Sequence, residues 1–499
     1  MPFRQIVFFL LAFIAPLAYA DITLPAVLSD HAVLQCNAPI HIWGWSKPSA
    51  KLIINFHKQT VAVIANNAGE WSGWLLPESA GGPFLLKIDG DGSISRKDIL
   101  VGDVWLASGQ SNMEFPLKGW AGAPLNNAEK ELNESTRPRL RLLLVPRASN
   151  LTPQTDIKAS WTECTPSTAA NFSAIAYFFG REISEKENIP IGLIDSTWGG
   201  TPVDSWMSMD TLGSSPAYWS VFHARAFFAD GESHRQKLDV IYQAQDTEAK
   251  ATGKPIPSHE WHPDQIAWLP TGLYNGMIAP LTPYSIKGFL WYQGEANSQS
   301  GRYRDYATLF SALIQDWRVR FAQGDLPFIY AQISSFYSPQ EHWGVIRDAQ
   351  RRALGLRNTA MIVTIDVGNP QNVHPGDKQT VSARMASAAL SMVYEEKIAS
   401  ASPTLRQVTN MPGALRVWFD HAQGLISRGA LDAFEIAGED RNFVHANATM
   451  ENETVIVSSP KIAFPVYVRY AWANDAKGSL YNAVGLPAST FTSENEPIE

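Results

Sequence analysis

A serine at the end of an apolar run is the first residue of this chain whose position suits nucleophilic chemistry. The run from Val104 to Ala107 is long enough for a buried strand, and Ser111 follows it after a Ser-Gly-Gln turn. Such a turn lifts a hydroxyl out of a sheet and leaves the next backbone N–H groups free to face a developing oxyanion. The spacing is not that of a G-x-S-x-G elbow, because Met113 stands where the second glycine would be. On spacing alone, a Gly-Ser-Asn turn without catalytic function is the commoner interpretation.

Two later stretches change that balance, because they contain the partners that a serine nucleophile needs. Residues 288–297, Gly-Phe-Leu-Trp-Tyr-Gln-Gly-Glu-Ala-Asn, form an apolar run that ends in polar side chains. Residues 372–378, Asn-Val-His-Pro-Gly-Asp-Lys, put His374 in a loop before a helical pattern. A serine hydroxyl is weak at neutral pH and needs a base within hydrogen-bond reach. Because strand ends of an open α/β sheet gather in one crevice, this order predicts a hydrolase-type site.

These stretches resemble the SGNH-hydrolase superfamily and, more narrowly, its sialate O-acetylesterase group of carbohydrate acetylesterases. The resemblance is carried by Gly-Gln-Ser-Asn-Met at 109–113, Trp-Tyr-Gln-Gly-Glu-Ala-Asn at 291–297 and Val-His-Pro-x-x-Lys at 373–378. It implies a flavodoxin-like, three-layer α/β/α fold and a serine esterase that removes O-acetyl groups from a carbohydrate through an acyl-enzyme. Acetylated hemicellulose oligosaccharides and O-acetyl sialic acid both stay open as substrates. No cofactor and no metal are expected.

The resemblance also implies roles for individual residues. Ser111 is the expected nucleophile, and His374 is the expected base. The expected oxyanion donors are the Ser111 backbone N–H, the N–H of Gly199 or Gly200, and the side-chain amide of Gln293. A buried structural amide is the alternative interpretation of Gln293, and Asn297 is the alternative donor from the same block.

The group that orients His374 is left open by the sequence. Many SGNH enzymes carry Asp three residues before the histidine, and this chain has the neutral Gln371 there. Asp366 ends the preceding apolar run and is the acid that we name as the candidate. A neutral or backbone partner is a second possibility, and Asp377 or another acid is a third.

Other chemistry fits the sequence less well. Asp103 and Glu295 suggest a two-carboxylate glycosidase, a mechanism that requires a carboxylate separation the sequence does not give. His259 and His262 have the spacing of half a metal site without an obvious third ligand, so we interpret them as part of a surface loop. The alternative from another class is a non-catalytic carbohydrate-binding protein on a degenerate hydrolase fold. The joint presence of the serine, the histidine and the amide argues against that alternative.

Composition narrows the class of protein. The chain has 499 residues, of which 45% are hydrophobic and 18% charged, so it can build a large core and two or three domains. Its net charge is −8 with no basic cluster, and we expect no nucleic-acid partner. The oligomeric state is not predictable. Cys36 and Cys164 are its two cysteines, and we expect unpaired buried thiols, although export would permit a disulfide.

The first twenty residues have the pattern of a signal peptide. Arg4 gives the positive start, Ile6 to Ile14 is apolar, and Ala-Tyr-Ala at 18–20 is a small-residue cleavage pattern. No later apolar stretch is long enough to span a bilayer. We therefore expect an exported protein, periplasmic or secreted, that starts near Asp21 and has an acetylated carbohydrate as its partner.

The distribution of periodic segments predicts three modules. Residues 21–99 contain short apolar runs between turn signals, which predicts an N-terminal β-sandwich. Strand and helix patterns alternate over residues 100–397, which predicts a parallel sheet. Within this module, residues 208–270 lack clear periodicity and are interpreted as an insertion that forms a wall of the substrate cleft. Residues 398–499 return to a β pattern, and we predict a C-terminal β-sandwich.

The tryptophans of the N-terminal module have two possible uses. The chain has 17 tryptophans, and both sugar stacking and core packing use this side chain. Trp71 and Trp74 are an odd number of residues apart, so in a regular strand they face opposite sides. One is expected in the core, and the other is expected to meet sugar or another domain.

Overall fold

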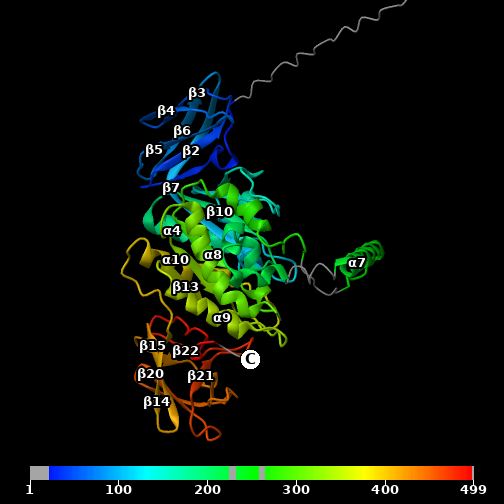
Figure 1. Ribbon diagram of the computed structural model, residues 1–499, viewed down its shortest axis with the longest axis vertical. Helices are drawn as coiled ribbons and strands as arrows, with labels where there is room; N and C mark the ends of the chain where they lie inside the picture. The colour runs from blue at the N-terminus through cyan, green and yellow to red at the C-terminus, as the bar shows by residue number, and fades with distance from the viewer. Residues whose placement is uncertain (1–21, 224–231, 258–263, 300, 497–499) are drawn as a thin grey trace, which may run out of the picture.

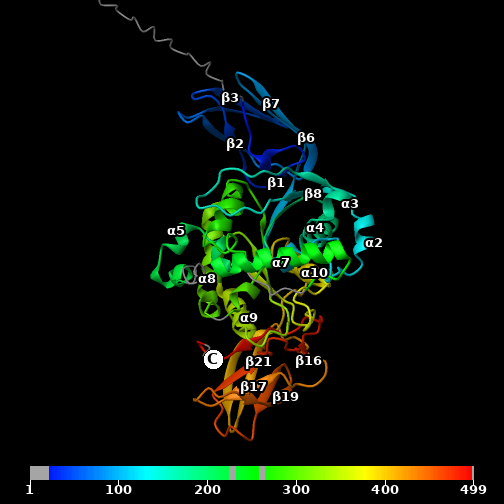
Figure 2. The same cartoon turned by 90° about the vertical axis from the view of Figure 1, so that its right-hand side faces the viewer.

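The computed structural model describes residues 22–223, 232–257, 264–299 and 301–496. The predicted signal peptide and the pair His259 and His262 lie outside these ranges. The described chain is a mixed α/β protein with a central sheet and additional β regions (Figures 1 and 2). The N-terminal and C-terminal β regions lie at opposite ends of the molecule, with the helices and the central sheet between them.

The central sheet carries the strands that lead to the predicted site residues. Its strand order is β13-β12-β11-β7-β10-β8-β9, and all of these strands are parallel except β9, which is antiparallel to β8. The strands are β7 (Ser93–Gly109), β8 (Arg137–Leu144), β9 (Thr162–Cys164), β10 (Ile191–Thr197), β11 (Gly288–Tyr292), β12 (Phe328–Gln332) and β13 (Thr359–Val363). The carboxyl ends of the parallel strands therefore meet at one edge, as the alternating pattern predicted.

The apolar composition of these strands follows from their complete burial. Every residue of β10, β11 and β12 is buried, as is typical of parallel strands with helices on the sheet. The helices pack in pairs, α4 (Ala174–Glu187) with α10 (Lys378–Met392) and α8 (Tyr306–Phe321) with α9 (Trp343–Arg352). The Ser173 hydroxyl caps α4 by accepting the Ala176 N–H, which fixes the start of the helix at Ala174.

Strand β7 joins the N-terminal region to the central sheet. Up to Asp98 its residues alternate between exposed and half-buried, and from Ile99 to Gly109 all are buried. Its first part pairs antiparallel with β6 (Gly81–Asp89), and its second part lies between β10 and β11. The predicted module boundary between residues 99 and 100 falls inside this one strand.

The rest of the N-terminal region consists of short strands. They are β1 (Val33–Gln35), β2 (Ile40–Trp45), β3 (Lys51–Phe56), β4 (Gln59–Ile64) and β5 (Glu70–Leu75), and β2 pairs only with β5. Burial alternates along β5, with Trp71 buried and Trp74 57% exposed. The prediction that these two tryptophans face opposite sides is confirmed.

The C-terminal region contains two four-stranded sheets and packs against the core. One sheet is β14 (Thr404–Met411), β15 (Ala414–Asp420), β20 (Thr454–Ser458) and β19 (Asn447–Glu451), and the other is β18 (Val444–His445), β17 (Phe434–Ala437), β21 (Tyr467–Tyr470) and β23 (Phe491–Thr492). A small pair, β16 (Ile426–Ser427) and β22 (Leu480–Tyr481), completes the region. Strand β23 contacts α9, where the Thr492 N–H donates to the Asp348 carboxylate at 3.2 Å.

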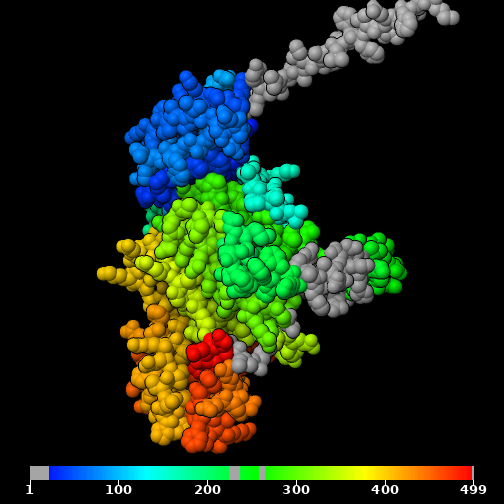
Figure 3. Space-filling model, in the orientation of Figure 1, coloured from blue at the N-terminus to red at the C-terminus, as the bar shows by residue number. Residues whose placement is uncertain are grey.

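The predicted insertion contains a long helix. Helix α7 (Glu232–Thr252) projects from the body of the molecule (Figures 1 and 3). The shorter helix α5 (Met209–Leu212) precedes it. None of the helices in the described ranges is both long enough and apolar enough to cross a membrane.

Both cysteines are unpaired and buried, as expected. The pKa of each thiol is raised to about 12, mainly by burial and, for Cys36, in part by the nearby Asp103. Asp103 itself accepts hydrogen bonds from Gln35 at 2.6 Å and from the Tyr394 hydroxyl at 2.8 Å. Asp103 is six residues before Gly109 on an extended strand, roughly 20 Å from the carboxyl end of the sheet. This distance excludes the glycosidase pairing of Asp103 with Glu295, which requires carboxylates within about 10 Å of each other.

Candidate active site

Ser111 is positioned by a sharp exit of the chain from β7. Gly109 has φ +132°, and a Cβ at this residue would lie 2.2 Å from the carbonyl oxygen of Tyr292. The next N–H, of Gln110, donates to the same carbonyl at 3.0 Å. Ser111 then begins the short helix α1 (Ser111–Glu114), whose first internal hydrogen bonds are donated by Met113 and Glu114. The N–H groups of Ser111 and Asn112 precede these bonds and are left for an acceptor outside the helix.

A cavity of about 440 Å³ opens beside Ser111. Four residues that the sequence singled out, Ser111, Gly199, Gly200 and His374, line it together. They follow β7, β10 and β13 in the chain. The predicted meeting of these residues at the carboxyl ends of the parallel strands is therefore observed. The lining also contains aromatic side chains and carboxylates that the sequence did not point to: Trp120, Phe336, Trp343, Glu114 and Glu341.

The turn after β10 packs directly on the serine. A Cβ at Gly199 would lie 3.2 Å from the Ser111 Cβ and 2.9 Å from Glu114 Oε2, so a side chain there would collide with the site. The Gly199 N–H donates to Glu114 Oε2 at 2.8 Å. Glu114 also pairs with Arg147, whose Nε lies 2.8 Å from Glu114 Oε1. Gly200 follows with φ +71°, the left-handed region that favours glycine.

Gln293 lies behind the cavity wall and is fully buried. Its amide nitrogen donates to the Thr201 carbonyl at 3.1 Å and to Asn297 Oδ1 at 2.7 Å. Its amide oxygen is 3.2 Å from the Tyr306 hydroxyl, which donates to it. The structure therefore does not bring the Gln293 amide to Ser111, because hydrogen bonds within the protein already use it. This arrangement corresponds to the alternative of a structural amide, and Asn297 is held in the same network.

Gln110 is a lining residue that the sequence analysis missed. Its side-chain oxygen accepts the Ala296 N–H at 3.1 Å, which fixes the amide at the edge of the cavity. A signal for it was present, since it stands immediately before Ser111 in the Gly-Gln-Ser-Asn-Met motif. Trp120, Glu114 and Glu341 have no such signal in the sequence.

Asn112 ties the serine helix to the histidine loop. Its side-chain nitrogen donates to the Val373 carbonyl at 3.1 Å and to Glu295 Oε1 at 2.6 Å. Its side-chain oxygen accepts from Lys378 Nζ at 2.6 Å. Asn112, Glu295 and Lys378 are all buried. The residue after Ser111 and the residue before His374 are thus joined through one side chain, which fixes the two loops relative to each other.

The surroundings of His374 favour the neutral imidazole. The pKa of His374 is lowered to about 4, mainly by burial and in part by the nearby Lys378. Its ring meets Trp120 edge-on, with 5.0 Å between the ring centroids. Burial also lowers the pKa of Lys378 to about 7, although Glu295 and Asp377 raise it, and burial raises the pKa of Glu295. A neutral imidazole in this position can accept a proton.

The structure does not bring Asp366 to His374. Both Asp366 oxygens accept hydrogen bonds from Arg384, each at 2.7 Å. Asp377 is occupied as the cap of α10, where it accepts from the Thr380 N–H at 3.0 Å and hydroxyl at 2.7 Å, and Gln371 is exposed. Across the described ranges, no carboxylate is hydrogen-bonded to the His374 ring. The acids near this loop serve to cap the helix and to pair with arginine.

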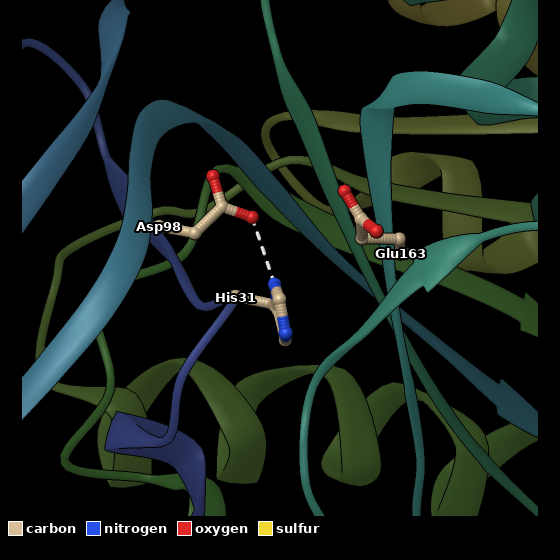
Figure 4. Close-up of side chains that lie close together, drawn as sticks. All are labelled: His31, Asp98 and Glu163. Atoms are coloured by element: carbon tan, nitrogen blue, oxygen red, sulfur yellow. Dashed lines mark hydrogen bonds and ion pairs between the residues drawn. The ribbon is translucent and has the colours of Figure 1, made fainter.

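One cluster among the described side chains has the composition of a metal site, and an arginine already neutralises it. His31 Nδ1 lies 2.7 Å from Asp98 Oδ2, and Glu163 lies beside them (Figure 4). The buried Arg141 places Nη2 2.8 Å from Asp98 Oδ2 and 3.7 Å from Glu163 Oε1. Since a guanidinium supplies the positive charge that a cation would bring, we interpret this cluster as an ion-pair network at the base of the central sheet.

Comparisons with known proteins identify the family of the chain. A family model described as carbohydrate esterase, sialic acid-specific acetylesterase, matches residues 249–391. Sialate O-acetylesterase from Homo sapiens is 30% identical over 71% of this chain and 68% of its own length, and the Mus musculus enzyme is 28% identical over 86% and 85%. The crystal structure of a carbohydrate acetylesterase from Xanthomonas citri is 33% identical, with a TM-score of 0.81 over 95% of this chain and 100% of that one. The chain therefore belongs to the sialate O-acetylesterase family of carbohydrate esterases, and it is a carbohydrate O-acetylesterase.

Proposed function

We propose that this esterase removes acetyl groups from the hydroxyls of a neutral glycan through an acyl-enzyme on Ser111. The observation that carries the proposal is the shared cavity of Ser111 and His374, with Asn112 holding the two loops together. Such a pair supplies a nucleophile and a base for acyl transfer. A non-catalytic carbohydrate-binding protein on a degenerate hydrolase fold would be expected to have lost this shared cavity.

The proposed reaction begins when neutral His374 takes the proton of the Ser111 hydroxyl. Ser111 Oγ attacks the acetyl carbonyl carbon, and the tetrahedral oxyanion faces the backbone N–H groups of Ser111 and Gly200. His374 then gives its proton to the departing sugar oxygen, which leaves an acetyl ester on Ser111. Water attacks this ester with His374 as the base, and acetate leaves as Ser111 regains its proton.

The choice of oxyanion donors follows from which N–H groups already donate a hydrogen bond to another group of the protein. The Gly199 N–H is bonded to Glu114, so Gly200 is the donor that we assign to this turn. The Gln293 amide is bonded inside the protein, so Gln110 is the side-chain donor that we assign in its place. Donors of this kind act because they point at the position where negative charge develops.

We propose a catalytic dyad of Ser111 and His374. The fixed position of the loop that carries His374 orients the imidazole, so no acid is needed for that purpose. The Asn112 bond to the Val373 carbonyl supports this, since it restrains the backbone that carries His374. The edge contact with Trp120 restrains the ring itself. The buried Lys378 and Glu295 fix Asn112 from the other side and act as positioning residues.

The charges of the cavity favour a neutral sugar over a sialic acid. Glu114, Glu295 and Glu341 line the cavity, and no lysine or arginine does so among the described residues. The carboxylate of a sialic acid would meet these acids without a cationic partner, because the nearby Arg147 is paired with Glu114. Trp120, Phe336 and Trp343 offer apolar surface for the sugar and the acetyl methyl group. Acetylated hemicellulose oligosaccharides are therefore the first candidate, and O-acetyl sialic acid, which the names of the relatives favour, is the second.

Acetate release tests this proposal directly. Wild type and Ser111→Ala are compared on acetylated xyloglucan and xylan oligosaccharides, on 9-O-acetyl sialic acid and on p-nitrophenyl acetate. We expect the highest kcat/KM on a neutral oligosaccharide and no turnover by Ser111→Ala on any substrate. A higher kcat/KM on the sialic acid overturns the choice of sugar. Full activity of Ser111→Ala overturns the assignment of the nucleophile.

We also propose the modules and the export that the sequence predicts. The modules are residues 21–99, 100–397 with the insertion 208–270, and 398–499. The helix pairs α4–α10 and α8–α9 support a three-layer α/β/α SGNH core for the middle module. Residues 1–20 would be removed on export to the periplasm or medium. Mass spectrometry of the protein expressed with its own N-terminus is expected to give a chain starting at Asp21, and a retained leader would contradict the proposal.

A further inference from the structure

A second cavity, of about 550 Å³, lies against the N-terminal β region and shares no lining residue with the cavity beside Ser111. Its floor is one face of the two-stranded sheet β2-β5, where Trp43 and Trp45 stand opposite Ser72 and Glu70. Its other wall comes from the middle of the chain and includes Gln154 and Pro283. The cavity is therefore built by two modules together.

The sheet face that forms the floor is unusually aromatic. The solvent side of an antiparallel pair is normally polar, and this one carries a stack of three rings. His41 lies between Trp74 and Trp43, with centroid distances of 4.4 and 4.9 Å and interplanar angles of 14° and 19°. His41 Nδ1 is 3.1 Å from the Pro283 carbonyl oxygen, which ties the stack to the core. The rings are thus held in place before any ligand arrives.

Core packing does not account for the whole of this aromatic surface. Trp74, at the outer end of the stack, is 57% exposed, and Trp45 is half-buried at the cavity. A solvent-facing aromatic row beside a concave surface is typical of a binding site, because indole rings offer a large flat contact area at a small entropic cost. Gln154, Thr155 and Ser72 are exposed polar residues of the same cavity. Rings for stacking and hydroxyl-binding groups are the two features that a sugar requires.

The charge of the cavity specifies a neutral ligand. Glu70 is its one carboxylate among the described lining residues, and that group accepts a hydrogen bond from Asn66 at 3.0 Å. No lysine or arginine lines the cavity in the described part of the chain. A phosphate, a sulfate or a uronic acid would find no cationic partner here.

We propose that this cavity is a glycan-binding site, separate from the catalytic one, that holds an unacetylated stretch of the same neutral polysaccharide. The identity of the ligand rests on the proposed function, whereas the existence of the site rests on the stacked rings and the cavity. Binding at two places on one chain raises the local concentration of acetyl esters near Ser111. Polymeric substrates would gain from the second site, and small esters would not.

Two variants of the cavity and one matched control test the proposal. Ser72→Arg fills the cavity from an exposed position, and Trp45→Ala removes a lining indole. Phe464→Ala is the control, since Phe464 is 87% exposed and does not line the cavity. Migration of each protein is measured in native gels that contain deacetylated xyloglucan or deacetylated xylan, and thermal unfolding shows that each variant is folded.

We expect at least one polysaccharide to retard wild type and Phe464→Ala, with about tenfold weaker binding by the two cavity variants. The KM for the acetylated polymer should rise in those variants, with kcat and p-nitrophenyl acetate hydrolysis unchanged. Absence of retardation of wild type in both gels overturns the proposal, and so does wild-type binding by Ser72→Arg. Failure of the esterase proposal has a different signature, because hydrolysis would then persist in Ser111→Ala while the retardation was unaffected.

Discussion

The neutral imidazole of His374 sets the chemistry that is available to Ser111. The ring is partly buried against Trp120 and lies near the buried Lys378, so a positive charge on it is disfavoured in the resting enzyme. In the proposed mechanism, the imidazolium that forms during attack must therefore be stabilised by the oxyanion created beside it. This makes the donors to that oxyanion more important than they would be in a site with an acid behind the histidine.

The pKa of His374 predicts the acid limb of the pH profile. Only the neutral ring can act as a base, so kcat/KM should rise with pH through about 4 and be level from about 5 to 7. The measurement is hydrolysis of p-nitrophenyl acetate between pH 3.5 and 8, and a midpoint near the ordinary histidine value of 6.5 would contradict it. Asp366→Asn is the matched control, because Asp366 pairs with Arg384, and its profile should equal that of wild type.

The same pKa has a consequence for stability. The folded-state pKa lies below the ordinary value of 6.5, so the unfolded chain binds more protons between pH 4 and 6.5. The contribution of His374 to the free energy of unfolding therefore rises with pH across that window and is complete above it. His374→Gln should remove this part of the pH dependence in urea unfolding curves.

Gln110 and Gln293 should respond differently to the same substitution. Gln110→Ala removes an amide that lines the cavity and should lower kcat by about 10²–10³, a loss much larger than its effect on Tm, which comes from the Ala296 N–H left without its acceptor. Gln293→Ala removes the amide that donates to the buried Thr201 carbonyl and to Asn297 Oδ1, so it should lower the free energy of unfolding by about 1–3 kcal/mol. Steady-state kinetics and thermal unfolding of both variants give the comparison. A large kcat loss confined to Gln293→Ala, with Tm unchanged, would restore the original assignment.

The sequence predicted that Ser111 and His374 meet but not which hydrogen bonds surround them, for a physical reason. Their meeting in one cavity was predictable because strand ends of a parallel sheet converge. Asp366 and Gln293 carry suitable groups, but Arg384 in α10 and Thr201 after β10 reach them first. Several side chains distant in sequence compete for each of these hydrogen bonds. A single sequence does not show which of them forms the bond in the folded protein.

At the scale of elements, the exit from β7 depends on the absence of a side chain at Gly109. Gly109→Ala combines φ +132° with a Cβ 2.2 Å from the Tyr292 carbonyl, so β7 and β11 would have to separate. We expect a loss of at least about 1–3 kcal/mol in the free energy of unfolding and a large loss of kcat, measured by urea unfolding and kinetics. Gly122→Ala is the control, because Gly122 has φ +80° with open space around it. Equal effects of the two substitutions would show that the backbone conformation alone is responsible.

Strand β7 also shows which features of an element the sequence can predict. The change of pattern near Ile99 was visible, because alternating burial gives way to an apolar run. The continuity of the strand was not visible, since both patterns are compatible with a turn between two modules. The first part of the strand pairs with β6 and the second part lies between β10 and β11, and those pairings involve residues far apart in the chain.

At the scale of the whole molecule, the C-terminal region holds one wall of the active-site cavity. Asn474 Oδ1 accepts the Trp343 N–H at 3.0 Å, and Asn474 Nδ2 donates to the carbonyls of Ser338 and Glu341. Trp343 and Glu341 line the cavity beside Ser111. A residue more than 130 positions away in the sequence, in the predicted C-terminal module, thus shapes the surface that meets the sugar.

Asn474→Ala should therefore affect sugar binding more than chemistry. Without the three hydrogen bonds, the segment that carries Glu341 and Trp343 is free to move, while Ser111, Asn112 and His374 keep their contacts. We expect KM for an acetylated oligosaccharide to rise about tenfold, the effect of losing about 1.4 kcal/mol of positioning, with kcat on p-nitrophenyl acetate within twofold of wild type. Asn410→Ala, an exposed position in β14 of the same region, controls for general effects on stability and should behave as wild type. If Asn474→Ala instead lowers kcat on both substrates equally, the C-terminal region acts on the catalytic residues themselves and not only on the wall that faces the substrate.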